Sequence, residues 1–153
     1  MKKIFLSFVL CFVAVVASAQ LKSLDAKFDL RGETGLGVGA TMDIGDNIEF
    51  SPSLSLFFPE AGAMYTAEAN FHYILPVDVH EQLDLFPIAG AGYFHYGYDF
   101  RGDSYSYNQL LVNIGFGARW HINETWAAFA EEKIQFTSHY NDNFLSIGVS
   151  YSF

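Results

Sequence analysis

Hydrophobic and polar residues alternate along most of this chain, and the alternation is most regular at its end. Between Leu145 and Phe153, every odd-numbered position is aliphatic or aromatic, and every even-numbered position is serine or glycine. A period of two places successive side chains on opposite faces of a β-strand. This segment therefore predicts a strand with one apolar face and one small polar face.

The same period recurs upstream and predicts more strands. The segments are 24–30, 36–44, 48–58, 65–75, 85–98, 110–122 and 126–136, in addition to 145–153. Residues 24–44 also fit one long strand. The short turns at 45–47, 76–82 and 122–124 must lie on the same side of the sheet as both termini, which requires an even number of strands. We therefore expect eight strands.

Three positions depart from the alternation. Glu132 falls on the apolar face of its strand, which indicates a bulge or a position near a membrane interface. Pro52 lies inside a strand although it cannot donate a ladder hydrogen bond. The segment 85–98 changes phase near Tyr93, as expected if its last part rises out of the membrane.

The start of the chain has the pattern of a secretory signal peptide. A basic start at Met1–Lys3 precedes an apolar segment, 4–16, and the small residues Ala17–Ala19. We expect residues 1–19 to be removed and residues 20–153 to form one barrel domain; a retained anchor is the alternative. Cys11, the only cysteine, lies in the apolar segment. The mature chain would then have no disulfide and no thiolate ligand.

The charge balance excludes one class of partner. The chain has 8 Lys and Arg residues and 17 Asp and Glu residues. Without Lys2 and Lys3, 6 basic residues remain against 17 acidic ones, a net charge of −11 with neutral histidines. Such a chain has no electrostatic footprint for nucleic acid. No apolar stretch is long enough for a membrane helix, and the remaining way to span lipid is a closed barrel.

Alternation does not decide which face points outward, because a soluble lipocalin-like barrel has the same period with apolar residues inside. The polar face combines glycines and serines with a few charged or ionisable residues: Glu68, His72, Arg119, Glu131 and Lys133. This composition suits the crowded interior of a small membrane barrel, where charges pair. Five aromatic residues would form a belt at one interface: Tyr73, Phe86, Trp120, Trp126 and Phe153.

The signal peptide, the Gly-x-Gly strands, the Pro52–Leu54 segment and the terminal Tyr151–Phe153 together resemble one family. This is the small outer-membrane β-barrel domain family, which includes OmpX-like, OmpA-barrel-like and short "porin family" proteins. The resemblance covers 24–153. It implies an all-β, eight-stranded antiparallel up-and-down transmembrane β-barrel in the cell outer membrane of a Gram-negative bacterium.

The resemblance also implies partners. Tyr151 and Phe153 would form the C-terminal signal that the outer-membrane assembly machinery recognises. The barrel would contact outer-membrane lipid and lipopolysaccharide, and we expect a monomer. Because the chain ends at Phe153, no peptidoglycan-binding domain is expected.

Function is less specified, and we expect a structural or surface-interaction role and not an enzyme. Aromatic residues gather around one predicted extracellular loop, and the candidate rim consists of Tyr96, Tyr98, Phe100, Arg101 and Tyr105. Exposed aromatic clusters bind extracellular protein or glycan partners. An upper aromatic girdle with a protruding hairpin is the alternative interpretation.

Two other functions remain open. Lipid A deacylases are small barrels that use Ser, His and Glu, and Ser138, His139 and Glu131 or Glu132 offer these types. However, adjacent residues on a strand point to opposite faces. A narrow pore is the second alternative, although Arg119 and Lys133 facing Glu68 and Glu131 would close so small a lumen.

No cofactor or metal site is expected. Residues 35–40 match the dinucleotide pattern G-x-G-x-x-A, but no helix follows. Inward glycines of a barrel wall explain the spacing better, because 90/92 and 115/117 repeat it. The five histidines do not form a metal pair with carboxylates at a suitable spacing.

Overall fold

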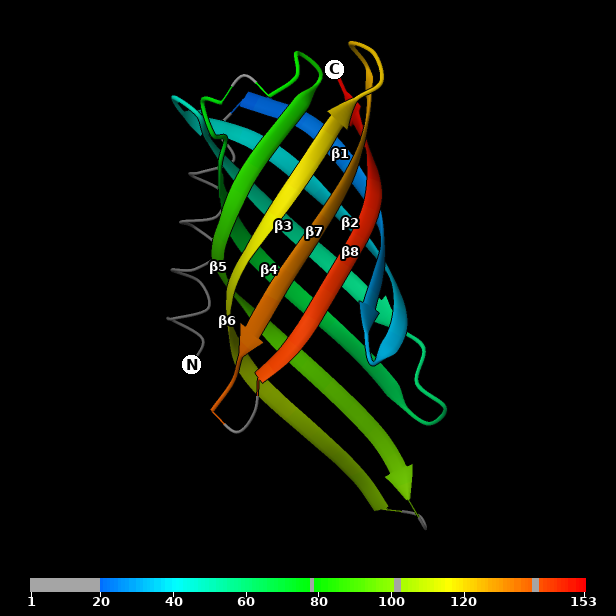
Figure 1. The fold of residues 1–153 in the computed structure, drawn as a ribbon. Coiled ribbons are helices and arrows are strands. Elements are labelled where there is room, and N and C mark those ends of the chain that lie inside the picture. Colours follow the sequence, from blue (N-terminus) through cyan, green and yellow to red (C-terminus); the bar gives the residue numbers. More distant parts are fainter. Residues whose placement is uncertain (1–19, 78, 101–102, 139–140) are drawn as a thin grey trace.

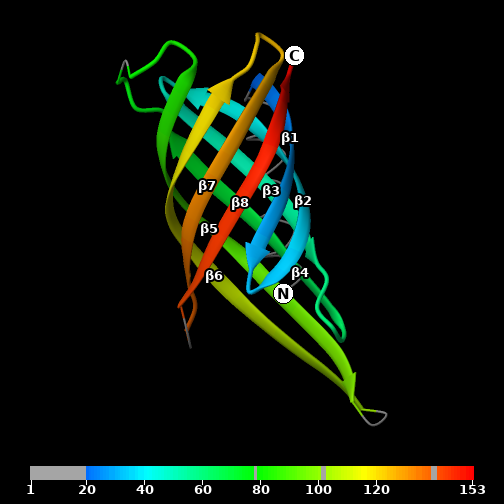
Figure 2. The ribbon, with the colours of Figure 1, turned by 45° about the vertical axis from the view of Figure 1, so that its right-hand side comes forward.

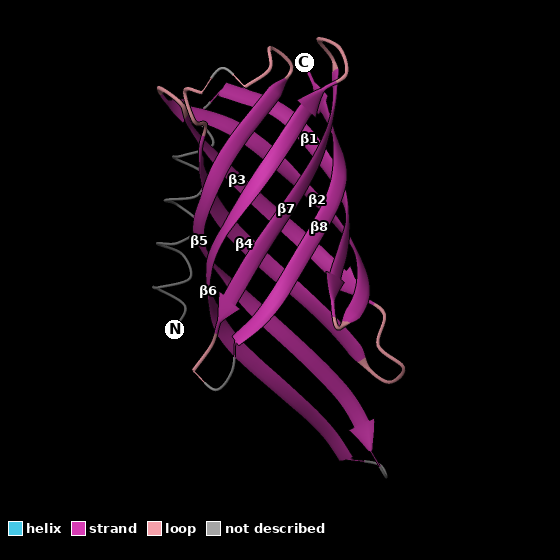
Figure 3. Ribbon diagram, viewed as in Figure 1, coloured by secondary structure: helices cyan, strands magenta, loops and turns pink. Residues whose placement is uncertain are grey.

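The computed structural model describes residues 20–77, 79–100, 103–138 and 141–153. Eight antiparallel strands follow one another around a closed barrel (Figures 1 and 3). They are β1 (Gln20–Arg31), β2 (Glu33–Gly45), β3 (Ile48–Phe57), β4 (Ala63–Tyr73), β5 (Leu83–Phe100), β6 (Asp103–His121), β7 (Trp126–Phe136) and β8 (Asn141–Ser152). This closed barrel confirms the predicted fold class and strand number. The predicted signal peptide lies outside the described residues.

Pairing between the first and last strands closes the barrel. The ladder between β1 and β8 runs from Ser23 opposite Ser152 to Leu30 opposite Leu145. In the described part of the chain, no helix is long and apolar enough to cross a membrane. We call the end with the β2–β3 turn and the C-terminus the turn end, and the opposite end, beyond which β5 and β6 extend, the hairpin end.

Two tight turns explain the strand boundaries in the first third of the chain. Gly32 alone separates β1 from β2, and its φ of +70° lies in the left-handed region that glycine adopts without strain. The connection is thus shorter than the predicted 31–35, and the single long strand is excluded. At the turn end, Asn47 has a φ of 60°, a conformation that asparagine tolerates.

The apolar face of the barrel points outward. Val38 and Ile147 on the outer wall are 63% and 53% exposed, whereas Lys133 and Asp29 inside the barrel are 0% exposed. A soluble barrel would bury the apolar face and hydrate the charged one. The lipocalin-like alternative is therefore wrong, and the outer wall matches a lipid-facing surface.

Aromatic residues gather on the outer wall at the turn end. Trp120, Trp126, Tyr73 and Phe153 are exposed there. Tyr151 contacts both Trp126 and Phe153, with ring centroids 5.1 and 5.4 Å apart. This arrangement is the belt expected at one membrane interface.

Phe86 does not belong to this belt, so that prediction is wrong. Its side chain is fully buried inside the barrel, where its ring stacks on His72 with centroids 4.6 Å apart. The reason is parity, because Phe86 lies between the outward-facing Leu85 and Pro87.

Pro52 and Glu132, the two single residues that depart from the alternation, behave differently in the structure. Pro52 pairs with Ala69 on β4, but the β2–β3 ladder records no partner for it between the pairs Gly39–Ser53 and Met42–Phe50. This local gap is what the missing N–H predicts. Glu132 is exposed on the outer wall and pairs with its neighbours on β6 and β8 without a register shift. The predicted bulge is absent there.

The hairpin of β5 and β6 extends beyond the barrel (Figure 2). Backbone pairing continues along it without a shift, but the outward positions of β5 are no longer apolar after Tyr93, where His95, Gly97 and Asp99 follow. Leu85 and Pro87 face outward, whereas Phe94 is buried in the lumen and Tyr96 packs beside it. A strand that leaves the membrane no longer needs an apolar outer face.

A charge at mid-height on the outer wall should oppose insertion. Ile147 lies near the middle of β8, and Leu110 lies on β6 beyond its last pair with β7, where it is 78% exposed. We expect Ile147→Arg to lower the free energy of unfolding in lipid vesicles by about 2–4 kcal/mol. Leu110→Arg should lower it by about 0–1 kcal/mol. Urea titrations followed by tryptophan fluorescence measure both values. Equal losses for the two variants would contradict the membrane position assigned to β8.

Candidate functional site

The lumen holds a group of buried ionisable side chains. The five residues that the sequence placed there, Glu68, His72, Arg119, Glu131 and Lys133, are all buried and lie on inward positions of β4, β6 and β7. Taking charges out of water is costly unless they are paired and hydrogen-bonded. The contacts of each group therefore decide whether the lumen is a stable core or a reactive site.

Glu68 is the centre of one network. Its carboxylate lies 2.7 Å from the Lys133 ammonium and also accepts hydrogen bonds from Gln135 and from Asn70, the latter at 3.1 Å. Asn70 in turn accepts a hydrogen bond from Asn113 at 2.9 Å. These contacts join β4, β6 and β7 across the interior, and they satisfy a carboxylate that has no access to solvent.

Arg119 is the centre of the second network, nearer the turn end. Its guanidinium donates two hydrogen bonds to Glu49, at 3.0 and 2.9 Å, in the bidentate arrangement that suits a carboxylate. Lys22 also binds Glu49. Asp84 lies 3.8 Å from Arg119 and accepts a hydrogen bond from His121 at 2.7 Å.

Glu49 belongs to this network although it is not among the five lumen residues predicted from the sequence. Its signal was available, because it alternates with Ile48 and Phe50 on the same face as Ser51, Ser53 and Ser55. What the sequence lacked was the stagger between β3 and β6, which brings Glu49 to Arg119 although 70 residues separate them.

His72 lies between the two networks. Nδ1 is 3.8 Å from Glu49 and Nε2 is 3.8 Å from Glu131, while the ring stacks on Phe86. The Arg119 guanidinium also lies over Phe86, 5.3 Å from its centroid. Gly117 makes room for this stack, because a Cβ there would come within 2.3 Å of the Phe86 ring.

A third group lies on β1 and its neighbours. Asp29 accepts hydrogen bonds from Ser55 and from Ser146, the latter at 2.6 Å, and the Lys27 ammonium is 3.8 Å away. A Cβ on Gly37 would approach the Asp29 carboxylate to 2.7 Å. Gly37 therefore leaves space for the Asp29 carboxylate, and Gly35 likewise leaves space for the Phe57 ring, which a Cβ would approach to 2.7 Å.

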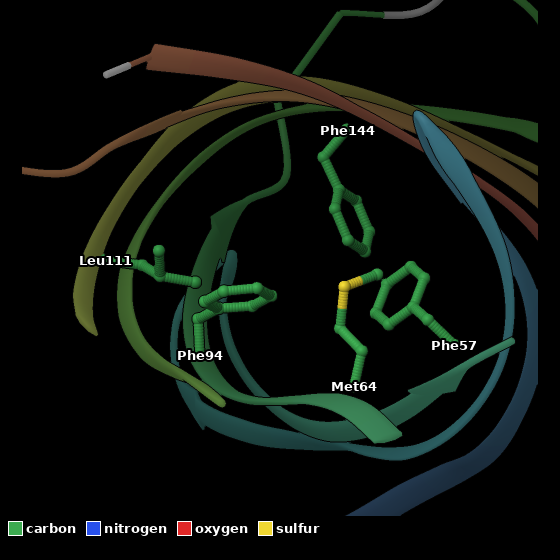
Figure 4. Packing of buried hydrophobic residues seen from close by; sticks show 5 residues of the cluster. All are labelled: Phe57, Met64, Phe94, Leu111 and Phe144. Carbon is green, nitrogen blue, oxygen red and sulfur yellow. The ribbon is translucent and has the colours of Figure 1, made fainter. Parts of the chain in front are cut away.

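An apolar plug closes the lumen at the hairpin end. We define it by five buried side chains from five strands: Phe57, Met64, Phe94, Leu111 and Phe144. Figure 4 shows them pointing from the wall into the lumen. Lys133 lies 4.7 Å above the Phe144 ring, so the plug sits directly against the polar networks.

The lumen is filled and does not form a channel through the described residues. The internal cavity lined by Asp25, Lys27 and Glu131, among others, has a volume of about 20 Å³. This is room for about one water molecule. Ion pairs and the apolar plug occupy much of the lumen, and an open cavity of about 730 Å³ lies at the turn end, lined by residues that include Lys22, Glu49 and Asp84. The geometry gives a pore no continuous path.

The residues of the esterase alternative are not all brought together. Glu131 faces the lumen, whereas Glu132 is exposed on the outer wall and Ser138 is exposed beyond the end of β7. His139 lies outside the described residues. Glu131 therefore cannot serve a rim site with Ser138.

The hairpin carries the candidate rim residues. On β5, Tyr96 stacks on Tyr98 with centroids 5.5 Å apart, and Tyr98 stacks on Tyr105 of β6 at 5.4 Å. Tyr96 also donates a hydrogen bond to the Ala61 carbonyl at 3.0 Å. Tyr98 and Tyr105 are 38% and 47% exposed. Phe100 ends β5, and Arg101 lies outside the described residues.

The aromatic face of the hairpin continues the plug. Phe94 belongs to the plug, and Tyr96 and Tyr98 follow at steps of two on the same face. The opposite face is polar: the Asn108 side chain accepts hydrogen bonds from Tyr93 and pairs with His95, each at 2.6 Å. Outside the membrane the hairpin is thus a ribbon with one aromatic and one polar face.

The described outer surface at the hairpin end is acidic. Glu33, Glu60, Asp99 and Asp103 are exposed there. The described basic side chains lie elsewhere: Lys27, Arg31, Arg119 and Lys133 are buried, and Lys22 binds Glu49 at the turn end. Arg31 is paired with Asp142 at 3.0 Å.

Solved structures of small outer-membrane barrels share this fold. The N-terminal β-barrel domain of Pseudomonas aeruginosa OprF is 15% identical over 88% of this chain and 100% of that domain, with a TM-score of 0.76. Neisserial surface protein A is 11% identical over 87% and 95% of the two chains, with a TM-score of 0.66. Yersinia pestis Ail, solved with the heparin analogue sucrose octasulfate, is 13% identical over 88% and 97%, with a TM-score of 0.61.

No protein-family model matches the sequence, and no curated protein matches it either. The structural neighbours agree with the resemblance to small outer-membrane barrels. At these identities they show the fold alone, and a fold of this kind does not specify an activity.

The Glu68–Lys133 pair gives a direct test of the polar core. We expect Lys133→Met to lower the free energy of unfolding by about 3–5 kcal/mol, because Glu68 would remain buried without its cation. Adding Glu68→Gln should restore most of this loss. Urea unfolding of Lys133→Met, Glu68→Gln, the double variant and the wild type in lipid vesicles measures the coupling. Additive losses would show that the two groups do not interact.

Proposed function

We propose that the protein is a small, non-enzymatic barrel of the outer membrane that displays the β5–β6 hairpin as an interaction surface. One observation carries the proposal: ion pairs and an apolar plug occupy the lumen, whereas the hairpin extends an exposed aromatic face beyond the barrel. A solute would have no continuous route through a lumen that is filled in this way. The surface that differs most from a plain barrel is the hairpin.

The outer wall supports the proposed location. Its apolar side chains would contact outer-membrane lipid and the acyl chains of lipopolysaccharide, with the turn end in the periplasm and the hairpin outside. Tyr151 and Phe153 are exposed at the turn end, where the assembly machinery would recognise them as a C-terminal signal. No second copy is needed to close the sheet, which supports a monomer.

Charge restricts the partner. Ail was solved with a polysulfated ligand. In the described part of the present chain, the exposed hairpin end offers carboxylates and no lysine or arginine, which disfavours a polyanionic glycan. Tyrosine faces beside carboxylates favour neutral or cationic groups. We therefore propose a cationic extracellular protein as the partner.

A shortened hairpin tests this function. In the variant, residues 95–108 are replaced by Asn-Gly, which joins the paired residues Phe94 and Gln109 by a two-residue turn. Intact cells that display each barrel are applied to an array of cationic peptides, anionic peptides and heparin. We expect the wild type to bind cationic peptides, and the variant to bind them about tenfold more weakly or less. Equal binding by both barrels would contradict the proposal.

Cysteine labelling controls for correct display. The only natural cysteine lies in the predicted signal peptide. Ser106→Cys in the hairpin should react with a membrane-impermeant maleimide on intact cells, and Asn47→Cys at the turn end should react only after permeabilisation. The reverse pattern would place the hairpin in the periplasm.

A further inference from the structure

Two tyrosines face each other on adjacent strands near the outer end of the hairpin. Tyr98 on β5 pairs directly with Tyr105 on β6, and their ring centroids lie 5.4 Å apart with an interplanar angle of 17°. Their side chains are 38% and 47% exposed. A parallel stack at this separation is a favourable aromatic contact. It also holds two phenols within reach of each other and of a reagent in solution.

The other tyrosine rings are less well placed to react with one another. Tyr107 turns its ring edge-on to Phe94, with centroids 6.2 Å apart. Tyr65 and Tyr93 on the outer wall are 6.4 Å apart, and their rings are tilted by 43°. Among the tyrosines that the structure describes, the stacked pair therefore has the shortest separation and the most nearly parallel rings.

Stacked phenols of this kind couple when both are oxidised. An oxidant removes the phenolic hydrogen atom of each ring, and the unpaired electron is then shared by the oxygen and the ortho carbons, Cε1 and Cε2. A carbon–carbon bond forms between one ortho carbon of each ring, and the two ring hydrogens displaced there return to the oxygens. The resulting dityrosine has two hydrogen atoms fewer than the pair. Hydrogen peroxide takes up both and gives two molecules of water.

The hairpin favours coupling within one chain. Exposed side chains change rotamer within nanoseconds, so the two rings can turn from the stack into the arrangement of the bond. Meanwhile the β5–β6 ladder keeps the backbones of Tyr98 and Tyr105 side by side. Two groups held on one molecule meet at an effective concentration of about 1 mM or more. This is far above the concentration of a second chain in a micromolar solution.

We infer that Tyr98 and Tyr105 form an oxidative modification site, at which hydrogen peroxide and a haem peroxidase convert the pair into a dityrosine cross-link. The bond joins β5 to β6 beyond the barrel wall and encloses residues 99–104 in a covalent loop, which fixes the outer part of the hairpin. The inference goes beyond the proposed interaction role and does not depend on any partner. It requires only that the two rings be accessible, as their exposure indicates.

The test treats the refolded protein, at micromolar concentration in detergent micelles, with a haem peroxidase and limiting hydrogen peroxide. The product is then unfolded and digested with trypsin. Arg101 is the only basic residue between the two tyrosines, so cleavage there separates residues 32–101 from residues 102–119. Tandem mass spectrometry should find these two peptides joined, at their summed mass less two hydrogen atoms, with the bond between Tyr98 and Tyr105. Dityrosine fluorescence measures the yield.

Two variants distinguish this site from general tyrosine oxidation. Tyr98→Phe removes one phenol and keeps the stacked ring, so the yield of cross-linked monomer should fall by about tenfold or more. Tyr107→Phe is the matched control, because Tyr107 lies two residues from Tyr105 on the same face of β6. It should leave the yield unchanged. A boiling-sensitive band on gels verifies that each variant is folded before oxidation.

Several results would overturn the inference. They are the absence of a cross-linked peptide, a covalent dimer as the main product, and a bond that joins other tyrosines. A yield that falls as far in Tyr107→Phe as in Tyr98→Phe would overturn it too, because the coupling would then not be specific to the stacked pair. None of these results bears on the binding measured with the shortened hairpin, so the two proposals can fail separately.

Discussion

The closed ladder of backbone hydrogen bonds is the constraint on which the structure depends. Lipid offers no partner to an N–H or C=O group, so each membrane-spanning strand needs a neighbour on both sides. Pairing of β1 with β8 supplies the last of these neighbours. In the closed wall, each side chain faces either the lipid or the lumen. Beyond the wall the constraint ends: the pairing of β6 with β7 begins only at Val112, and the outward positions of β5 after Tyr93 are no longer apolar.

The lumen follows from the same closure. Side chains that cannot face lipid are forced into a space with little water, where a charge is tolerated only with partners. Glu68 has three donors, and Glu49 receives the bidentate contact of Arg119. The apolar plug completes the filling at the hairpin end. Because the interior serves as a core, the surface that remains for specific recognition is outside the membrane.

The sequence predicted which face a side chain occupies better than the height at which it lies. Alternation gave eight strands, the turn at 45–47 and the inward positions of Glu68 and Lys133. It did not give the Glu49–Arg119 pair or the plug, because both depend on the stagger between strands far apart in sequence. Phe86 was misassigned to the belt because it was judged by residue type and not by parity. At Glu132 the parity was correct and the bulge is absent, so a position near a membrane interface stays a prediction.

The central claim is that the barrel folds with its apolar face toward lipid and its charges inside. Gel electrophoresis of the protein, refolded in detergent micelles or in aqueous buffer and loaded with and without boiling, tests it most directly. The account predicts a compact, faster-migrating band that appears only with detergent and disappears on boiling. A folded, monodisperse protein in buffer alone would contradict it, because the outer wall could not then be apolar.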